Sequence, residues 1–107
     1  MRAVVCNSYG SPELLQVTDF PEPVPGPGQL LIDVSAAGVS YVDTLTIRNR
    51  HQFKHALPFV PGMEVAGRVA ALGEGVSGFT VGDRVMALLF DGGYALRAVA
   101  DASESFL

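Results

Sequence analysis

The chain of 107 residues has little cysteine, little positive charge and no long apolar run. Its single cysteine, Cys6, excludes an internal disulfide and a cysteine-based zinc cluster, and it fits a reducing compartment. Cys6 ends an apolar run, which predicts a buried and unreactive thiol. Seven Lys and Arg residues against eleven Asp and Glu leave a net charge of −4. This is too little positive charge to neutralise a phosphate backbone, so no nucleic-acid partner is expected.

Two further absences concern membranes. No apolar run approaches the roughly 18–20 residues needed to cross a bilayer. Residues 1–6 are not followed by the long apolar core and small-residue cleavage site of a signal peptide. We therefore expect a cytoplasmic protein without a membrane partner.

The abundant residues indicate a turn-rich β fold. Hydrophobic residues make up 49% of the chain, and its 12 glycines and seven prolines separate the apolar runs. Strands are predicted at residues 1–6, 14–20, 29–37, 63–72, 84–89 and 94–100, with the prolines of residues 21–27 in an extended connection. Ser40 is a candidate cap for a short helix that continues to Arg48, and residues 91–93, Asp-Gly-Gly, predict a hairpin turn. The pattern predicts one domain, a Greek-key barrel or sandwich with a small helical excursion.

Three motifs, in order along the chain, resemble those of one family. Residues 37–43 read AGVSYVD, residues 61–69 read PGMEVAGRV with a Gly-x-Glu-x-x-Gly pattern, and residues 81–85 read VGDRV. The opening MRAVV and the GGYA of residues 92–95 also fit. Together they resemble the zinc-free quinone oxidoreductase (zeta-crystallin-like) branch of the medium-chain dehydrogenase/reductase superfamily, in its N-terminal domain. The resemblance implies a mainly β, GroES-like, partly open β-barrel with one or two short helices.

The resemblance also implies a function. Residues 1–107 correspond to the GroES-like (alcohol dehydrogenase-like N-terminal) catalytic domain. A nucleotide-binding Rossmann domain is absent from this stretch, because no strand, Gly-x-Gly-x-x-Gly turn and helix follow one another. The implied activity is hydride transfer from NADPH to a small quinone or enone, without zinc, with this domain on the substrate side. The absent domain would bind most of the cofactor, so the isolated chain is expected to be inactive. The parent enzyme is expected to be a homodimer.

Two other functions remain open at this point. One is an enoyl thioester reductase of the same superfamily, and the other is a non-enzymatic GroES-like module of the binding or co-chaperonin type. Leu45 departs from the family pattern, since relatives often carry tyrosine or histidine at this position. A leucine cannot relay a proton, which fits an acceptor that takes its proton from water.

The residues at the metal positions of the superfamily predict a site without zinc. The zinc-dependent branch has a cysteine just before its active-site helix and a histidine in Gly-His-Glu, where this chain has Ser40 and Met63. The zinc-dependent branch also has a four-cysteine lobe after the Gly-Asp-Arg-Val turn, and this chain has no cysteine in that region. His51 and His55 lie four residues apart, but among basic residues, and a solvated basic loop is predicted there rather than a metal site or an anchor for cofactor phosphates.

The candidate site residues follow from the resemblance. Ser40 would hydrogen-bond the nicotinamide ribose or a substrate oxygen, with a plain helix cap as the alternative. Tyr41 would stack on a flat acceptor or donate its hydroxyl to a developing oxyanion, with packing as the alternative. Asp43 would bind a cofactor hydroxyl, or is otherwise a first-turn acid favoured by the helix dipole. Tyr41 and Asp43 are thus the catalytic candidates, and Ser40 and Asp43 are the candidates for cofactor binding. Tyr41, Phe59 and Phe90 are the candidates for the substrate pocket. The alternative for the two phenylalanines is ordinary packing in the core.

The Gly-x-Glu-x-x-Gly motif also yields structural expectations. Gly62 and Gly67 are expected where the backbone approaches another segment closely or takes unusual dihedral angles. Glu64 lies within an apolar run, where a carboxylate needs a partner, and Arg68 or Arg84 is the expected one.

Overall fold

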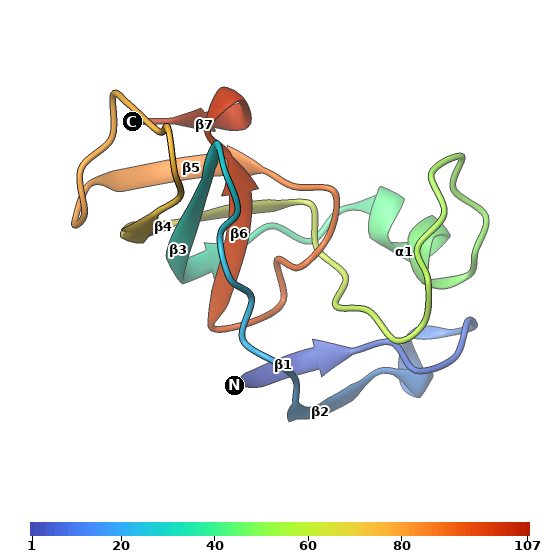
Figure 1. The fold of residues 1–107 in the computed structure, drawn as a ribbon. Helices are drawn as coiled ribbons and strands as arrows, with labels where there is room; N and C mark the ends of the chain where they lie inside the picture. Colours follow the sequence, from blue (N-terminus) through green and yellow to red (C-terminus); the bar gives the residue numbers. More distant parts are fainter.

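The computed structural model describes residues 1–107 and consists of a curved five-stranded sheet beside a two-stranded hairpin (Figure 1). All strand pairs are antiparallel. The order in the large sheet is β6–β3–β4–β5–β7, with β3 at Gln29–Ala37, β4 at Glu64–Leu72, β5 at Arg84–Leu88, β6 at Arg97–Asp101 and β7 at Ser105–Phe106. The hairpin pairs β1, Arg2–Val5, with β2, Gln16–Asp19. The prediction of a mainly β fold is confirmed.

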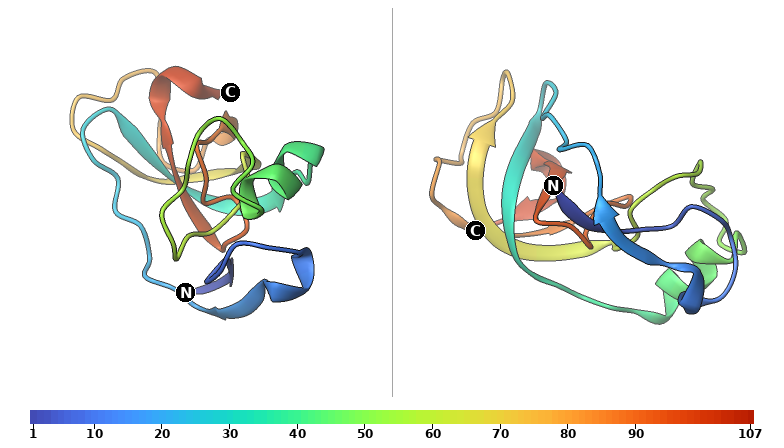
Figure 2. Two further views of the ribbon diagram at one scale, coloured as in Figure 1. Left: turned by 90° about the vertical axis from the view of Figure 1, so that its right-hand side faces the viewer. Right: turned by 90° about the horizontal axis from the view of Figure 1, so that it is seen from below.

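The large sheet curls because its two longest strands bend together. β3 and β4 follow the same curve in the view from below (Figure 2, right). Their register shifts twice, between Leu31 and Ile32 and again between Val34 and Ala36. Extra residues of this kind bend a strand and increase its twist, so the sheet becomes an open half-barrel rather than a flat layer.

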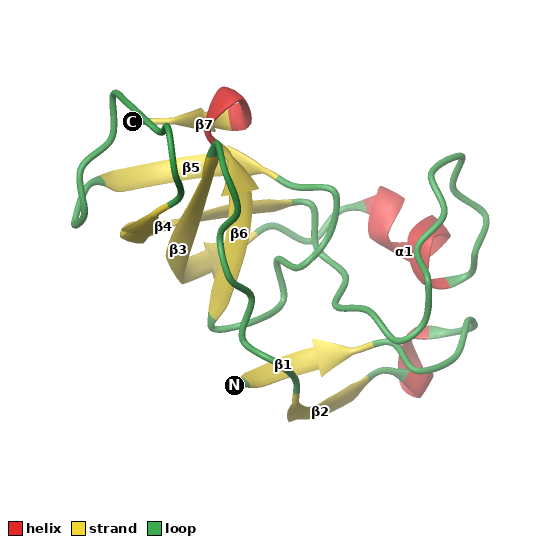
Figure 3. Cartoon of the chain, viewed as in Figure 1, coloured by secondary structure: helices red, strands yellow, loops and turns green.

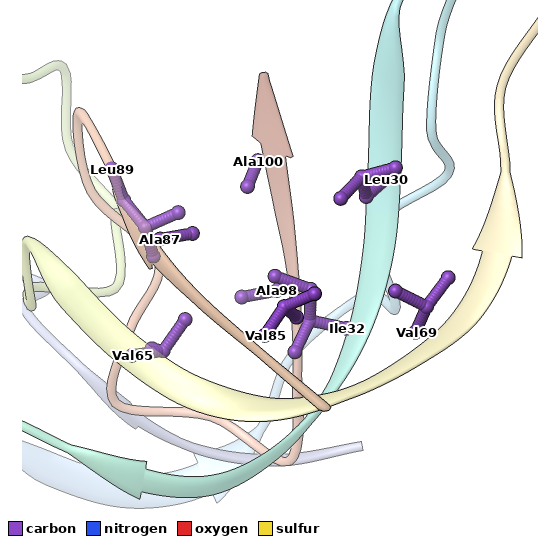
Figure 4. Close-up of a cluster of buried hydrophobic side chains, with 9 residues drawn as sticks. All are labelled: Leu30, Ile32, Val65, Val69, Val85, Ala87, Leu89, Ala98 and Ala100. Atoms are coloured by element: carbon purple, nitrogen blue, oxygen red, sulfur yellow. The ribbon is translucent and has the colours of Figure 1, made fainter. Parts of the chain in front are cut away.

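The main core lies on the concave face of this half-barrel. Alternation along β4 buries Val65 and Val69 and leaves Ala66 and Arg68 exposed. The nine buried residues of the cluster are Leu30, Ile32, Val65, Val69, Val85, Ala87, Leu89, Ala98 and Ala100 (Figure 4). They come from β3, β4, β5, the residue after β5, and β6, so one apolar cluster holds four strands together.

The hairpin is fastened to the segment that precedes β4. Cys6 and Phe59 exchange backbone hydrogen bonds of 2.8 and 3.2 Å, and both pack on Ile47 of helix α1, which spans Tyr41–Ile47. Cys6 is buried as predicted, and burial raises the pKa of its thiol. Seven residues long, α1 is much too short to cross a membrane, and no other helix of the chain is long and apolar enough to do so.

Some predicted element bounds hold and others move. The strand predicted at 29–37 is confirmed as β3. The predicted helix begins directly after its cap Ser40, as expected, and ends one residue earlier, at Ile47. A short 3-10 helix at Pro12–Leu14 delays β2 to Gln16, and β6 begins only at Arg97.

The hairpin predicted at residues 91–93 is wrong. β5 pairs with β4 and β7, whereas β6 pairs with β3. Figure 3 shows that the chain between β5 and β6 runs as a loop. This loop crosses to residues 60–62 and hydrogen-bonds there, from the amides of Gly92, Gly93 and Tyr94, and this long-range pairing overrides the local turn preference.

Candidate functional site

The start of α1 is organised around the carboxylate of Asp43. Ser40 takes the N-cap position with φ −126° and ψ 166°, as predicted, and forms a capping box with Asp43 at the third helical position. In this box the backbone N–H of Ser40 donates to Asp43 Oδ2 over 3.1 Å. Ser40 itself is exposed.

Asp43 itself is buried, with 5% of its surface exposed. Its Oδ2 also accepts a short hydrogen bond from the hydroxyl of Tyr94, a residue 51 positions further along the chain. Its Oδ1 is buried and has no hydrogen-bond partner. A buried carboxylate oxygen without a partner is costly and therefore uncommon, which marks this position as one that deserves a functional test.

Tyr94 was not foreseen as part of the site. Its residue type was visible in the GGYA stretch, but nothing local places a tyrosine at position 94 beside an aspartate in α1. The backbone brings them together, because the amide of Tyr94 donates to Pro61 O over 2.9 Å and its carbonyl accepts from Val4 N over 2.8 Å. Tyr94 thereby joins the helix to the segment before β4.

The pKa of Tyr94 is raised above the ordinary tyrosine value, chiefly by burial and then by its hydrogen bond to Asp43. The negative charges of Asp43 and Glu64 add to the effect. Below the unfolded value of about 10 the phenol is protonated in both states and contributes no pH dependence. Above it the unfolded chain releases a proton that the folded chain keeps, so folding stability falls as the pH rises toward the folded pKa.

Tyr94→Phe should therefore flatten the alkaline loss of stability. We expect the free energy of unfolding of the wild type to fall more steeply between pH 10 and pH 12 than that of the variant, by a slope of about one proton. Urea unfolding at a series of pH values measures both slopes. Tyr41→Phe is the matched control, because Tyr41 is 75% exposed, and this substitution should leave the slope unchanged. Parallel curves for the wild type and Tyr94→Phe would contradict the prediction.

The segment of residues 91–94 lies against residues 60–62. Three amides donate across the gap: Gly92 to Val60 O at 2.7 Å, Gly93 to Gly62 O at 3.1 Å, and Tyr94 to Pro61 O. Gly62 has φ +107°, and a Cβ there would lie 2.9 Å from Gly93 Cα. Both expectations for Gly62, unusual dihedral angles and close approach, are confirmed.

The predicted site residues fall into two groups. Ser40 and Tyr41 are exposed side by side at the start of α1, and the neighbouring Val39 is exposed too. Phe59 and Phe90 instead line a cavity of about 580 Å³. Other residues of its wall include Met1, Phe20, Pro58, Leu88 and Arg97, and Tyr41 is not among its lining residues. The structure thus brings the two phenylalanines together but does not place Tyr41 in the same cavity.

The basic loop contains a residue that sequence reasoning missed. The exposure predicted for Arg48, Arg50 and Lys54 is confirmed, but His55 is buried. Its Nδ1 lies 2.8 Å from Asp91 Oδ2. The prediction of a solvated His55 was wrong because its basic sequence neighbours gave no sign of an acidic partner 36 residues away.

The partner expected for Glu64 was also wrong. Glu64 is exposed and forms no ion pair with Arg68 or Arg84. Arg68 donates instead to Gly82 O over 3.0 Å. Glu64 is on the outward face of β4, beside Gly38, where water solvates the carboxylate and removes the need for a partner. No group of three or more His, Cys, Asp or Glu side chains is placed to hold a metal ion.

The curled, open β half-barrel with one short helix is consistent with a GroES-like fold. The chain belongs to the alcohol dehydrogenase GroES-like domain family, whose sequence pattern matches residues 26–104. This confirms both the GroES-like fold and the resemblance to the quinone oxidoreductase branch of the superfamily.

Individual proteins agree with that assignment. A quinone oxidoreductase from Sus scrofa is 43% identical over 102 residues, which cover 94% of this chain and 31% of that protein. A probable oxidoreductase from Mycobacterium abscessus superimposes with a TM-score of 0.92 at 44% identity, over 99% of this chain and 34% of the other. A mycobacterial structure complexed with NADPH superimposes with a TM-score of 0.89 at 37% identity, over 98% of this chain and 33% of the other. The chain spans about a third of the length of the curated relatives it matches.

Proposed function

We propose that residues 1–107 form the substrate-side domain of an NADPH-dependent quinone or enone oxidoreductase that transfers hydride without zinc. The observation that carries the proposal is the similarity to quinone oxidoreductases along nearly the whole chain. The chain covers about a third of those proteins, so the rest of the active site, including most of the cofactor site, would come from a nucleotide-binding domain.

The start of α1 fits a cofactor that presents hydroxyl and amide groups. The Ser40 hydroxyl belongs to an exposed residue and can both donate and accept a hydrogen bond. In this proposal Ser40 binds the nicotinamide ribose or the acceptor oxygen. NADPH, when bound, supplies the hydride, and the protein contributes orientation and electrostatics.

Asp43 is the support beneath this contact. Its burial and its bonds to the Ser40 amide and the Tyr94 hydroxyl favour a role in holding the helix start in place. A direct bond from Asp43 to a cofactor hydroxyl, which the resemblance implies, requires Oδ1 to become accessible. Either role orients Ser40 and Tyr41, and orientation of the reacting groups supplies much of the rate in transfer reactions.

The acceptor would meet aromatic side chains. The exposed Tyr41 offers a ring for stacking and a hydroxyl that can donate to a developing oxyanion. Phe59 and Phe90 line a cavity together with Pro58 and Leu88, and these side chains would offer apolar contact to a flat ring. Leu45 is half-buried in α1, and its aliphatic side chain has no acidic proton to donate. In this proposal the reduced acceptor therefore takes its proton from water.

The test is oxidation of NADPH by the intact protein with a small quinone, followed at 340 nm before and after exhaustive chelation. We expect turnover that chelation leaves unchanged, because Ser40 and Met63 stand where the zinc-dependent branch has a cysteine and a histidine. Loss of turnover on chelation, with recovery on added zinc, would contradict the zinc-independent mechanism. Turnover with an enoyl thioester alone would replace the quinone by that substrate class.

A further inference from the structure

The proposed reaction gives no role to His55, although this side chain is buried and has an acidic partner. Its side chain is 1% exposed, and its Nδ1 lies 2.8 Å from Asp91 Oδ2. Its imidazole stacks on the ring of Phe59, with centroids 5.0 Å apart, and tilts against the ring of Phe90 at 4.1 Å. An ionised carboxylate only accepts hydrogen bonds, so Nδ1 carries the proton and donates to Asp91.

His55 is also the only buried residue in its loop. Every residue from Arg48 to Pro58 is exposed except His55 and the half-buried His51. Residues 48–50 hydrogen-bond to the end of α1. Beyond them, and apart from the side chain of His55, the tie of this stretch to the rest of the domain is the hydroxyl of Tyr9, which donates to the His55 carbonyl. Both of these ties meet at His55, so His55 holds the part of the loop that follows residue 50.

The acidic partner belongs to a well-fixed segment. Asp91 is the first of residues 91–94, whose next three amides donate to residues 60–62. The other end of that segment reaches Asp43 through the hydroxyl of Tyr94. The His55–Asp91 pair therefore links an exposed loop to the same segment that supports the helix start.

We infer that His55 is a positioning residue: its bond to Asp91 holds the loop of residues 48–58 closed and keeps Phe59 and Phe90 in place as walls of the cavity. The two phenylalanines line the cavity of about 580 Å³, and both contact the His55 ring. Without the bond, the imidazole can leave its place between the rings, and the apolar wall loses its fixed shape. The consequence for the acceptor rests on the proposed function, whereas the loop-holding role does not.

Limited trypsin digestion of the intact protein tests the loop-holding role. Arg50 and Lys54 are exposed cleavage sites beside His55. His55→Phe keeps a ring between the phenylalanines but removes the donor, and Asp91→Ala removes the acceptor from a residue whose side chain is 33% exposed. We expect cleavage after Arg50 and Lys54 to become about tenfold faster in each variant, as loss of one partly buried, charge-assisted hydrogen bond predicts.

Two further variants serve as comparisons. Asp91→Asn keeps an oxygen that can accept from Nδ1, so its cleavage rate should stay within about threefold of the wild type. His51→Gln changes the other histidine of the loop, whose ring nitrogen contacts only the local amide of Phe53, and should leave the rate unchanged. The double variant His55→Phe/Asp91→Ala should be cleaved no faster than either single variant, because both remove the same bond.

The effect on the cavity is read separately. In aromatic NMR spectra, the ring signals of Phe59 and Phe90 should shift toward free-phenylalanine values in Asp91→Ala and stay near wild type in His51→Gln. With a small quinone, KM should rise about fivefold in Asp91→Ala while kcat changes little, the pattern of lost ground-state binding.

The outcomes separate the two proposals. Wild-type cleavage rates in both His55→Phe and Asp91→Ala would overturn the loop-holding role. Faster cleavage with unmoved phenylalanine signals would overturn the effect on the cavity. If neither quinones nor enones support NADPH oxidation by the intact protein, the proposed function is wrong. The rate of proteolysis and the phenylalanine ring signals still decide the role of His55 in that case.

Discussion

Gly67→Ala is expected to lower the free energy of unfolding by about 3 kcal/mol or more, an overpacking effect at the upper end of its usual range. A Cβ at position 67 would lie 1.9 Å from the carbonyl oxygen of Asp33 and 3.0 Å from Ile32 Cγ2. The first obstacle is backbone, and it belongs to β3 in the interior of the sheet. β3 cannot move away without disturbing its pairing with β6, so the clash cannot be relieved locally.

Urea unfolding followed by circular dichroism measures this loss. Gly75→Ala is the matched comparison, because Gly75 has φ +78° but no atom within 4 Å of the added Cβ. It should cost only about 1 kcal/mol, the strain of an alanine at positive φ. If Gly67→Ala costs no more than Gly75→Ala, the close approach between β4 and β3 is not the reason for the glycine.

The two longest strands of this fold could be predicted from the sequence, whereas the contact that requires Gly67 could not. The alternation of β3 and β4 is a local property, and the strand at 29–37 was predicted with its observed bounds. The need for glycine at 67 was also expected from its motif. That the obstacle would be the carbonyl of Asp33 depends on the register of β3 against β4, which no local pattern specifies.

The site shows the same limit more strongly. Ser40, Tyr41 and Asp43 were proposed as site residues from the family resemblance, and the helix start after Ser40 was predicted correctly. Two partly buried polar pairs join distant residues: Asp43 and Tyr94 are 51 positions apart, and His55 and Asp91 are 36 positions apart. They arise because residues 91–94 pair with residues 60–62, a contact that the local hairpin signal at Asp91 concealed.

Asp43→Ala is expected to lower kcat/KM for quinone reduction about a hundredfold, the order that a displacement of about 1 Å costs in an oriented reaction. The substitution leaves the Ser40 amide and the Tyr94 hydroxyl without their acceptor. It should also lower the free energy of unfolding by about 2 kcal/mol, since each unmet donor costs part of its desolvation energy. Steady-state kinetics of the intact protein and urea unfolding measure the two effects.

Two matched variants distinguish the support of the helix start from a general loss of structure. Asp43→Asn keeps an acceptor oxygen but not the charge, and should lose about tenfold in kcat/KM. Arg48→Ala lies at the other end of α1, where its side chain bonds only the Thr44 carbonyl at 3.4 Å, and should leave both kinetics and stability close to wild type. Wild-type activity in Asp43→Ala would remove Asp43 from the site.

Tyr94→Phe decides how Asp43 acts. If Asp43 works by holding the helix start against residues 91–94, removal of the Tyr94 hydroxyl should reproduce a large part of the kinetic loss, and the double variant should lose little more than Asp43→Ala alone. If Asp43 instead bonds a cofactor hydroxyl through Oδ1, Tyr94→Phe should leave kcat nearly unchanged, because its bond is to the other oxygen. The burial of Asp43 and its two bonds to the surrounding protein favour the first result.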